Sequence, residues 1–161
     1  MAGQYPFFIC PQYSAAKHGC VGLVRTAAPA LLKHEKIALN CIMPAFVATN
    51  IIPSEIVEQF PAEHITPLST IMRAFDELID ESGRVESDGK SQGMDGVPKN
   101  GCAVECVIDE LFYREPVNYA NASQEWLTDQ SREEGIFGQA WQKHFVAIAS
   151  SGSGRGIKNS S

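Results

Sequence analysis

The stretch from Pro11 to Thr49, PQYSAAKHGCVGLVRTAAPALLKHEKIALNCIMPAFVAT, decides the fold of this 161-residue chain. Within it, small and apolar side chains recur at helical spacing over residues 14–34, which predicts one long helix. Pro29 lies inside that helix and costs it about 3 kcal/mol, so we expect a kink or a break there. The apolar run at 37–43 is closed by a proline and predicts a buried parallel strand. A long helix followed by such a strand indicates an α/β fold.

The patterns that follow are weaker. Beyond Pro53 we expect two helices, 54–60 and 69–81, that form a lid or wall, and the second is amphipathic. Residues 81–100 are polar and rich in glycine, which predicts a flexible insertion. A second strand is expected at 102–108, and a short helix is expected near 124–133. The organisation that we predict is therefore one domain over 1–149, with the flexible insertion at 81–100, followed by a disordered tail over 150–161.

Composition and charge exclude several classes of partner. The formal net charge is -6, whereas nucleic-acid binding needs clustered lysine and arginine, so we expect no nucleic-acid partner. The chain shows no signal-peptide pattern and no run of 18 apolar residues, which predicts a cytoplasmic protein without a membrane partner. The five cysteines lack metal-ligand spacing, so we expect reduced thiols and no metal site. A small molecule is therefore a more suitable ligand for this chain than a nucleic acid or a membrane.

Tyr13 and Lys17 are the candidate chemical groups of the long helix. Positions four apart share one helix face, so the phenol and the ammonium can converge on one point. A nearby ammonium favours the phenolate, which makes the tyrosine a better proton acceptor near neutral pH. The spacing alone is a weak signal, because an exposed tyrosine and lysine fall four apart on many helices.

The residues around this pair carry a stronger signal. The pattern P-x-Y-S-A-A-K-H-G-x-V-G-L-V-R, followed by L-N-x-I-x-P-A-F-V-x-T, resembles the active-site helix, next strand and following loop of short-chain dehydrogenases/reductases. The resemblance implies that Tyr13 is the general acid/base and that Lys17 holds the nicotinamide ribose. It implies further cofactor contacts from Pro44, Val47 and Thr49, with Thr49 beside the carboxamide. Ala45 stands where this family more often has glycine.

The resemblance is close over residues 3–51 and looser over 66–80 and 101–126, where the chain is similar to fungal hydroxyprostaglandin-dehydrogenase-like members. It implies an NAD(P)-dependent oxidoreductase that interconverts a secondary alcohol and a ketone, acts on a small apolar substrate and has a possible place in secondary metabolism. Both NAD and NADP stay open, because the family's coenzyme selector belongs to its N-terminal half.

The family's phosphate-binding loop and catalytic serine also belong to that N-terminal half, which we expect to be absent. The expected fold is thus the C-terminal part of a Rossmann-type doubly wound parallel sheet, with its last two strands, active-site helix and lid helices. The alternative is a non-catalytic remnant, from a truncated gene model or a decoy subunit, that at most pairs with a full-length relative. Homo- or hetero-oligomers would use the active-site helix.

Overall fold

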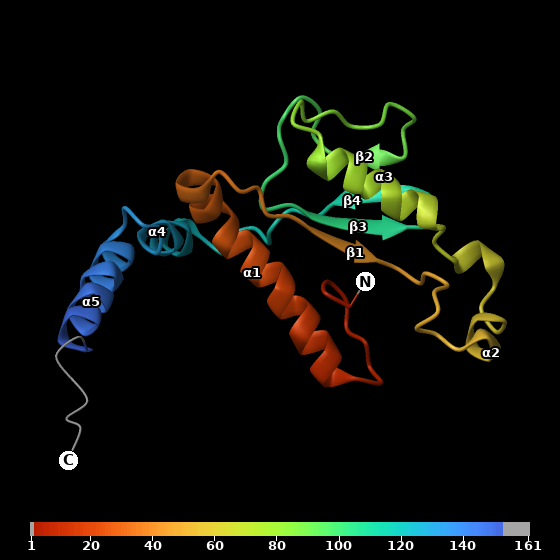
Figure 1. Ribbon diagram of the computed structural model, residues 1–161, viewed down its shortest axis with the longest axis horizontal. Coiled ribbons are helices and arrows are strands. Elements are labelled where there is room, and N and C mark those ends of the chain that lie inside the picture. The colour runs from red at the N-terminus through yellow and green to blue at the C-terminus, as the bar shows by residue number, and fades with distance from the viewer. Residues whose placement is uncertain (1, 153–161) are drawn as a thin grey trace, which may run out of the picture. The chain divides into compact units, whose positions relative to one another are not determined.

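The computed structural model describes residues 2–152, which form two compact units that divide between Glu115 and Pro116 (Figure 1). Residues 153–161, which make up most of the expected tail, lie outside the described residues. The second unit holds two helices, α4 (Ala122–Gln130) and α5 (Ile136–Gly152). The first unit holds, in chain order, α1 (Pro11–Glu35), β1 (Cys41–Pro44), α2 (Ser54–Val57), the 3-10 turn η1 (Ala62–His64), α3 (Leu68–Ile79), β2 (Ser91–Gln92), β3 (Ala103–Val107) and β4 (Glu110–Tyr113).

The sheet of the first unit has the strand order β1-β3-β4-β2. The parallel pair β1–β3 places Cys41 opposite Ala103 and Pro44 opposite Cys106, so both strands end at the same edge. β4 returns antiparallel to β3, and the short β2 runs parallel to β4. The sequence predicts the two parallel strands and misses β2 and β4. A two-residue polar strand has no apolar pattern of its own, so only its pairing identifies it.

β1 is shorter than the predicted strand 37–43, because its start is held by side chains. The Leu39 N–H donates to Asn100 Oδ1 at 3.0 Å, and Asn40 Nδ2 donates to the Lys99 carbonyl at 2.9 Å. Asn40 Oδ1 accepts from the Cys102 N–H at 3.0 Å. Together with the backbone bond from the Gly101 N–H to the Leu39 carbonyl at 2.8 Å, these side-chain bonds join the chain before β1 to the chain before β3.

Helices cover both faces of the sheet, and Figure 1 shows α1 on one side and α3 on the other. Successive residues of a strand point to opposite faces. Val21 of α1 therefore packs with Met43 and Ala103 on one face. The opposite face holds the larger buried cluster, Ile71, Ala74, Val104, Cys106 and Leu111. This layering confirms the expected α/β fold of Rossmann type.

α1 begins at Pro11 rather than at residue 14 and continues through Pro29. Proline suits the first turn of a helix, where its missing N–H has no partner to lose. Of the kink or break expected at Pro29, the break does not occur, because the helix is continuous from Pro11 to Glu35. Ala28 beside Pro29 is fully buried, and its carbonyl accepts from Asn100 Nδ2 at 3.1 Å. Tertiary contacts on this turn therefore help to hold the helix together across the proline.

Residues 81–100 make specific contacts with the sheet. The buried Glu77 of α3 accepts from the Ser91 hydroxyl and the Tyr113 hydroxyl, both at 2.8 Å, and from the Glu86 N–H at 3.1 Å. The Lys99 ammonium is also buried and donates to three backbone carbonyls of the same segment. The flexibility expected here stays a prediction, and these contacts are where it can be tested.

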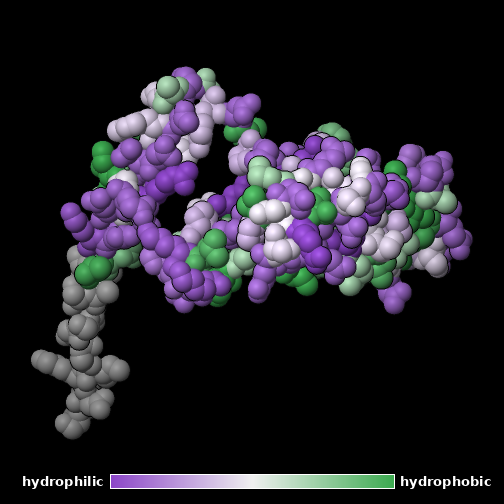
Figure 2. Space-filling model, turned by 90° about the horizontal axis from the view of Figure 1, so that it is seen from above, coloured by the Kyte–Doolittle hydropathy of each residue, from purple (hydrophilic) through white to green (hydrophobic). Residues whose placement is uncertain are grey.

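The remaining helices follow the sequence patterns with shifted ends. α3 matches the predicted helix 69–81, α2 is shorter than 54–60 and is followed by η1, and α4 matches 124–133 approximately. α5 was not expected from the sequence. Seen from above, the surface of the first unit is mainly polar with apolar areas between (Figure 2). Among the described residues, no helix has the length and apolar character that crossing a membrane requires.

Candidate active site

The first turns of α1 bring Tyr13 and Lys17 together as their spacing predicts. Lys17 Nζ lies 5.2 Å from the centroid of the Tyr13 ring. The Tyr13 side chain is 47% exposed, so its phenol is open to a ligand. An ammonium at this distance over an aromatic ring is attracted by the negative ring face. The pair is therefore held in contact and remains accessible.

The segment before α1 fixes the orientation of the tyrosine. Ser14 Oγ accepts from the Phe7 N–H at 2.9 Å, which ties the approach segment to the first turn of the helix. The Phe7 ring then meets the Tyr13 ring edge-on, with the centroids 5.9 Å apart and the planes at 61°. The sequence reasoning missed Phe7 and Ser14 as supporting residues, although the serine stands next to the tyrosine in the motif.

The direction of α1 places this pair near the carboxyl ends of β1 and β3. Ala28, late in the helix, contacts the chain at Asn100, just before β3. Val21, two turns earlier, packs on Met43 near the end of β1. A Cβ on Gly3 would lie 3.0 Å from the Val21 side chain and 3.1 Å from the Lys17 carbonyl, so the backbone passes closely over this part of α1. In open α/β sheets, ligands bind outside this strand edge.

The loop after β1 begins at the same edge. The Ala45 N–H donates to the Cys106 carbonyl at 2.9 Å, and the Phe46 ring stacks on Phe60 with centroids 3.9 Å apart. Among the described residues, Ala45 is not one of those with positive φ, so alanine adopts this backbone without strain. The replacement of the more usual glycine is thus compatible with the loop.

The predicted cofactor residues of this loop differ in the exposure of their side chains to solvent. Pro44 ends β1 and pairs with Cys106 in the register of the sheet. Val47 packs against the buried cluster under α3, so its side chain is committed to the core. Thr49 is exposed and borders an open hollow of about 570 Å³ together with Asn50, Ile52, Pro53, Ser54, Val57 and Glu58. The structure places Tyr13 and Lys17 in direct contact and brings the loop to the same edge of the sheet.

From the sequence, a set of apolar side chains after the first strand suggests a pocket wall, and in the structure this set divides between core and surface. The set is Phe46, Ile51, Ile52, Phe60, Ile71 and Phe75. Ile71 joins the buried cluster on the sheet, whereas Ile51 is 91% exposed. Phe46 and Phe60 stack on each other, and Ile52 borders the hollow beside Thr49. Phe75, which lies on the outer side of α3, is exposed with Met72 and Ile79. The wall near the candidate site therefore comes mainly from the loop and α2.

Charged and ionisable groups beneath the sheet serve the fold. The buried Glu105 carboxylate accepts from Arg114 Nε at 2.7 Å and from the Tyr5 hydroxyl at 3.3 Å. The five cysteines are free thiols, and burial raises the pKa of Cys106 to about 11. Burial and the neighbouring Glu77 carboxylate likewise raise the pKa of Tyr113. Cys106 and Tyr113 therefore stay uncharged near neutral pH.

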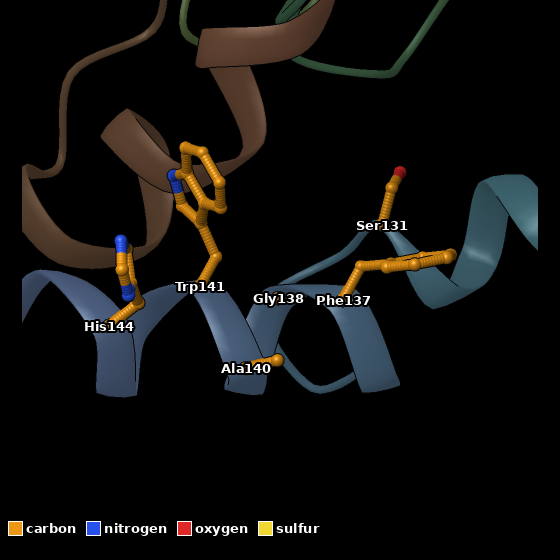
Figure 3. Close-up of a pocket in the computed structure, with 6 residues that line it drawn as sticks. All are labelled: Ser131, Phe137, Gly138, Ala140, Trp141 and His144. Carbon is orange, nitrogen blue, oxygen red and sulfur yellow. The ribbon is translucent and has the colours of Figure 1, made fainter.

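A second hollow lies in the α4–α5 unit. Figure 3 shows the Phe137, Trp141 and His144 side chains along α5 on one side of it. Trp141 also meets Phe145 edge-on, with ring centroids 5.1 Å apart. Neither residue of the tyrosine and lysine pair lines this hollow.

Comparison with known proteins identifies a family and similar sequences. The short chain dehydrogenase family profile matches residues 1–58, which include the Tyr13–Lys17 pair, β1 and the loop after it. The chain is similar to two Penicillium rubens proteins named short-chain dehydrogenase/reductase. It is 31% identical to prx6 over 109 residues, which are 68% of this chain and 32% of prx6. It is 29% identical to prx7 over 142 residues, which are 84% of this chain and 49% of prx7.

A third similar protein is the 15-hydroxyprostaglandin dehydrogenase [NAD(+)] of Bos taurus. The identity is 37% over 79 residues, which are 47% of this chain and 30% of that protein. The chain thus spans half the length or less of these curated relatives. The motif, the α/β layering and the matched relatives lead to one conclusion: the chain belongs to the short-chain dehydrogenase/reductase family.

Proposed function

We propose that this chain carries the acid/base centre of an NAD(P)-dependent oxidoreductase that interconverts a secondary alcohol and a ketone. The observation that supports it most directly is the Tyr13–Lys17 pair, in which the ammonium lies 5.2 Å from the centroid of an exposed phenol ring. The pair lies near the carboxyl ends of two parallel strands, where α/β enzymes bind their ligands. The named relatives are dehydrogenases, which agrees with this chemistry.

The side chains at this edge fit the nicotinamide end of a coenzyme. The Lys17 ammonium offers up to three donors and the Tyr13 hydroxyl one more, and both suit the hydroxyl groups of a ribose. The exposed Thr49 hydroxyl, beside the open hollow, suits a carboxamide. When bound, the nicotinamide would supply or accept the hydride. One relative is named for NAD(+), and the proposal for this chain extends to NAD or NADP.

Tyr13 would exchange a proton with the oxygen of the substrate. In reduction of a ketone the phenol donates its proton to that oxygen, and in oxidation of an alcohol the phenolate removes it. The Lys17 charge stabilises negative charge on the phenol oxygen during both steps. Phe7 packs edge-on against the tyrosine ring and holds its orientation.

The substrate that we propose has an apolar substituent. The hollow beside Thr49 is bordered by Asn50, Ser54 and Glu58, and also by the carbon surface of Ile52, Pro53 and Val57, which supports an apolar substituent. One relative's name specifies a hydroxyprostaglandin, a molecule with a hydroxyl group and a long apolar chain. A secondary alcohol of that kind is therefore the first substrate to test.

The decisive experiment joins this chain to the N-terminal half of an active relative and measures turnover from nicotinamide absorbance. Tyr13→Phe should lower turnover about 100-fold or more with little change in coenzyme affinity. Tyr119→Phe is the matched control, because Tyr119 is 46% exposed and lies outside α1. Lys17→Met should weaken coenzyme binding and shift the pH optimum of the residual activity upward. Full turnover of the Tyr13→Phe fusion would refute the proposal.

The same fusion distinguishes the alternative of a non-catalytic chain. A fusion that binds coenzyme but turns over no alcohol or ketone would favour a role in pairing with a full-length relative.

A further inference from the structure

We propose that Thr66 is a positioning residue, which holds the loop after β1 and thereby sets the place of Thr49. Thr66 lies between η1 and α3, and only 1% of its surface is exposed. The contacts of the described residues support the first part of this proposal, that Thr66 holds the loop. The second part, that Thr66 thereby affects coenzyme binding, rests on the proposed function.

Thr66 binds the two chain segments that follow the parallel strands. Its backbone N–H donates to the Phe46 carbonyl at 2.7 Å, in the loop after β1. Its hydroxyl oxygen accepts from the Ile108 N–H at 3.0 Å, in the turn after β3. One buried residue therefore ties the candidate nicotinamide loop to the turn at the end of the neighbouring strand.

The turn at Ile108 is a defined anchor. Ile108 has φ 54°, a left-handed conformation that is rare for a β-branched residue and costs about 1–2 kcal/mol. Both of its backbone groups are held by threonine hydroxyls, the N–H by Thr66 and the carbonyl by Thr70, whose Oγ1 donates at 2.6 Å. These two bonds offset the cost of the conformation, so the turn stays in one place and fixes Thr66 in turn.

The position of Thr49 depends on the attachments that precede it. Ala45 is bonded to β3, Phe46 is bonded to Thr66, and Val47 packs into the core. Ala48, Thr49, Asn50 and Ile51 are exposed. The place of Thr49 is therefore set by the attachments at Ala45, Phe46 and Val47, and loosening the one at Phe46 removes one of these three.

Hydrogen exchange on the whole chain tests the holding of the loop. Thr66→Val replaces the hydroxyl by a methyl group of the same shape and leaves the Ile108 N–H without its acceptor. We expect exchange to rise about fivefold at the amides of Ala45 and of residue 66, the change that follows loss of one typical hydrogen bond. Thr66→Ser keeps the hydroxyl and should restore the original rates.

Two controls separate this effect from a general loss of stability. The Cys41 N–H donates to the Cys102 carbonyl at 2.9 Å, at the opposite end of the same two strands, and its exchange should not change. Thr70→Val removes the other threonine hydroxyl from the turn but leaves the bond between Thr66 and the Ile108 N–H, so exchange at Ala45 should rise less than it does in Thr66→Val. Unchanged exchange at Ala45 and residue 66 in Thr66→Val, or an equal rise at Cys41, would overturn the proposal.

In an active fusion, Thr66→Val should raise the KM for the coenzyme severalfold with a smaller effect on kcat, and Thr66→Ser should reverse the change. A KM equal to that of the parent fusion would refute the positioning role. An inactive parent fusion, with the exchange result as expected, would contradict the proposed function and leave the holding of the loop by Thr66 supported.

Discussion

Lys99→Met removes a buried positive charge on which residues 81–100 depend. The Lys99 side chain ends in an ammonium that donates to the carbonyls of Gly83, Met94 and Val97 at 2.8, 2.6 and 2.7 Å. The residue is 5% exposed, and all three of its donors are used. Methionine has a similar length and no donor, so the change tests the hydrogen bonds rather than the packing.

The expected decrease in the free energy of unfolding follows from these three hydrogen bonds. A hydrogen bond from a charged donor contributes about 1.5–3 kcal/mol, and an acceptor left buried without a partner costs a similar amount. The simple sum is too large, because Met94 and Val97 are exposed and water can reach their carbonyls after a small movement. The apolar methionine also regains some burial. We therefore expect the free energy of unfolding to fall by about 2–4 kcal/mol.

Lys90→Met is the matched control from the same segment. Lys90 Nζ lies 3.0 Å from Asp109 Oδ2, and both side chains are about half exposed, so this ion pair contributes at most about 1 kcal/mol. Urea unfolding followed by far-UV circular dichroism measures both variants. Tryptophan fluorescence would not serve, because Trp126 and Trp141 both lie in the second unit.

The comparison also decides whether residues 81–100 are flexible, as their composition predicts. If the segment were mobile, Lys99→Met would leave the free energy of unfolding unchanged. Equal stability of the Lys99→Met and Lys90→Met variants would refute the reasoning from burial and support the flexible insertion.

Two further predictions concern this segment and Asp80, the residue just before it. Gly83→Ala should destabilise the fold by about 2–4 kcal/mol, because Gly83 has φ 71° and an added Cβ would lie 2.3 Å from a backbone carbon across the loop. Gly89→Ala, at φ 76° in open space, should cost only about 1–2 kcal/mol, and equal losses in chemical unfolding would contradict the steric argument. The Ser82 hydroxyl, and then Arg84, lower the pKa of Asp80 to about 2. The folded state thus favours the carboxylate, so the contribution of Asp80 is present above about pH 4 and is lost as the pH falls toward 2. Asp80→Asn should flatten the dependence of stability on pH in that window, and an unaltered slope would show that Asp80 does not contribute.

The sequence determined the elements whose signal is local. The helix over α1 and the strand β3 follow from the spacing of apolar residues over one segment, and the structure confirms both. The Tyr13–Lys17 contact follows from the same cause, because positions four apart meet on any helix. The family resemblance rests on this segment too, which is why the candidate site could be proposed before any tertiary contact was known.

Tertiary structure decided the features that depend on distant partners. The helix at Pro29 continues without the break that the local rule allows beside a kink, and its neighbour Ala28 is buried and bonded to Asn100. The strand β2 exists through its pairing with β4, and Lys99 is buried in a segment whose composition predicts exposure.

The role of Thr66 is the clearest case of this second kind. Nothing in its neighbourhood along the chain marks it, because its partners Phe46 and Ile108 lie 20 and 42 residues away. The left-handed φ of Ile108 also contradicts its intrinsic preference and exists beside two threonine hydroxyls from another element. The spacing of residues along one segment predicts the backbone hydrogen bonds that the segment makes within itself. Buried polar groups instead form hydrogen bonds with groups from distant parts of the chain, so only the folded structure reveals these bonds.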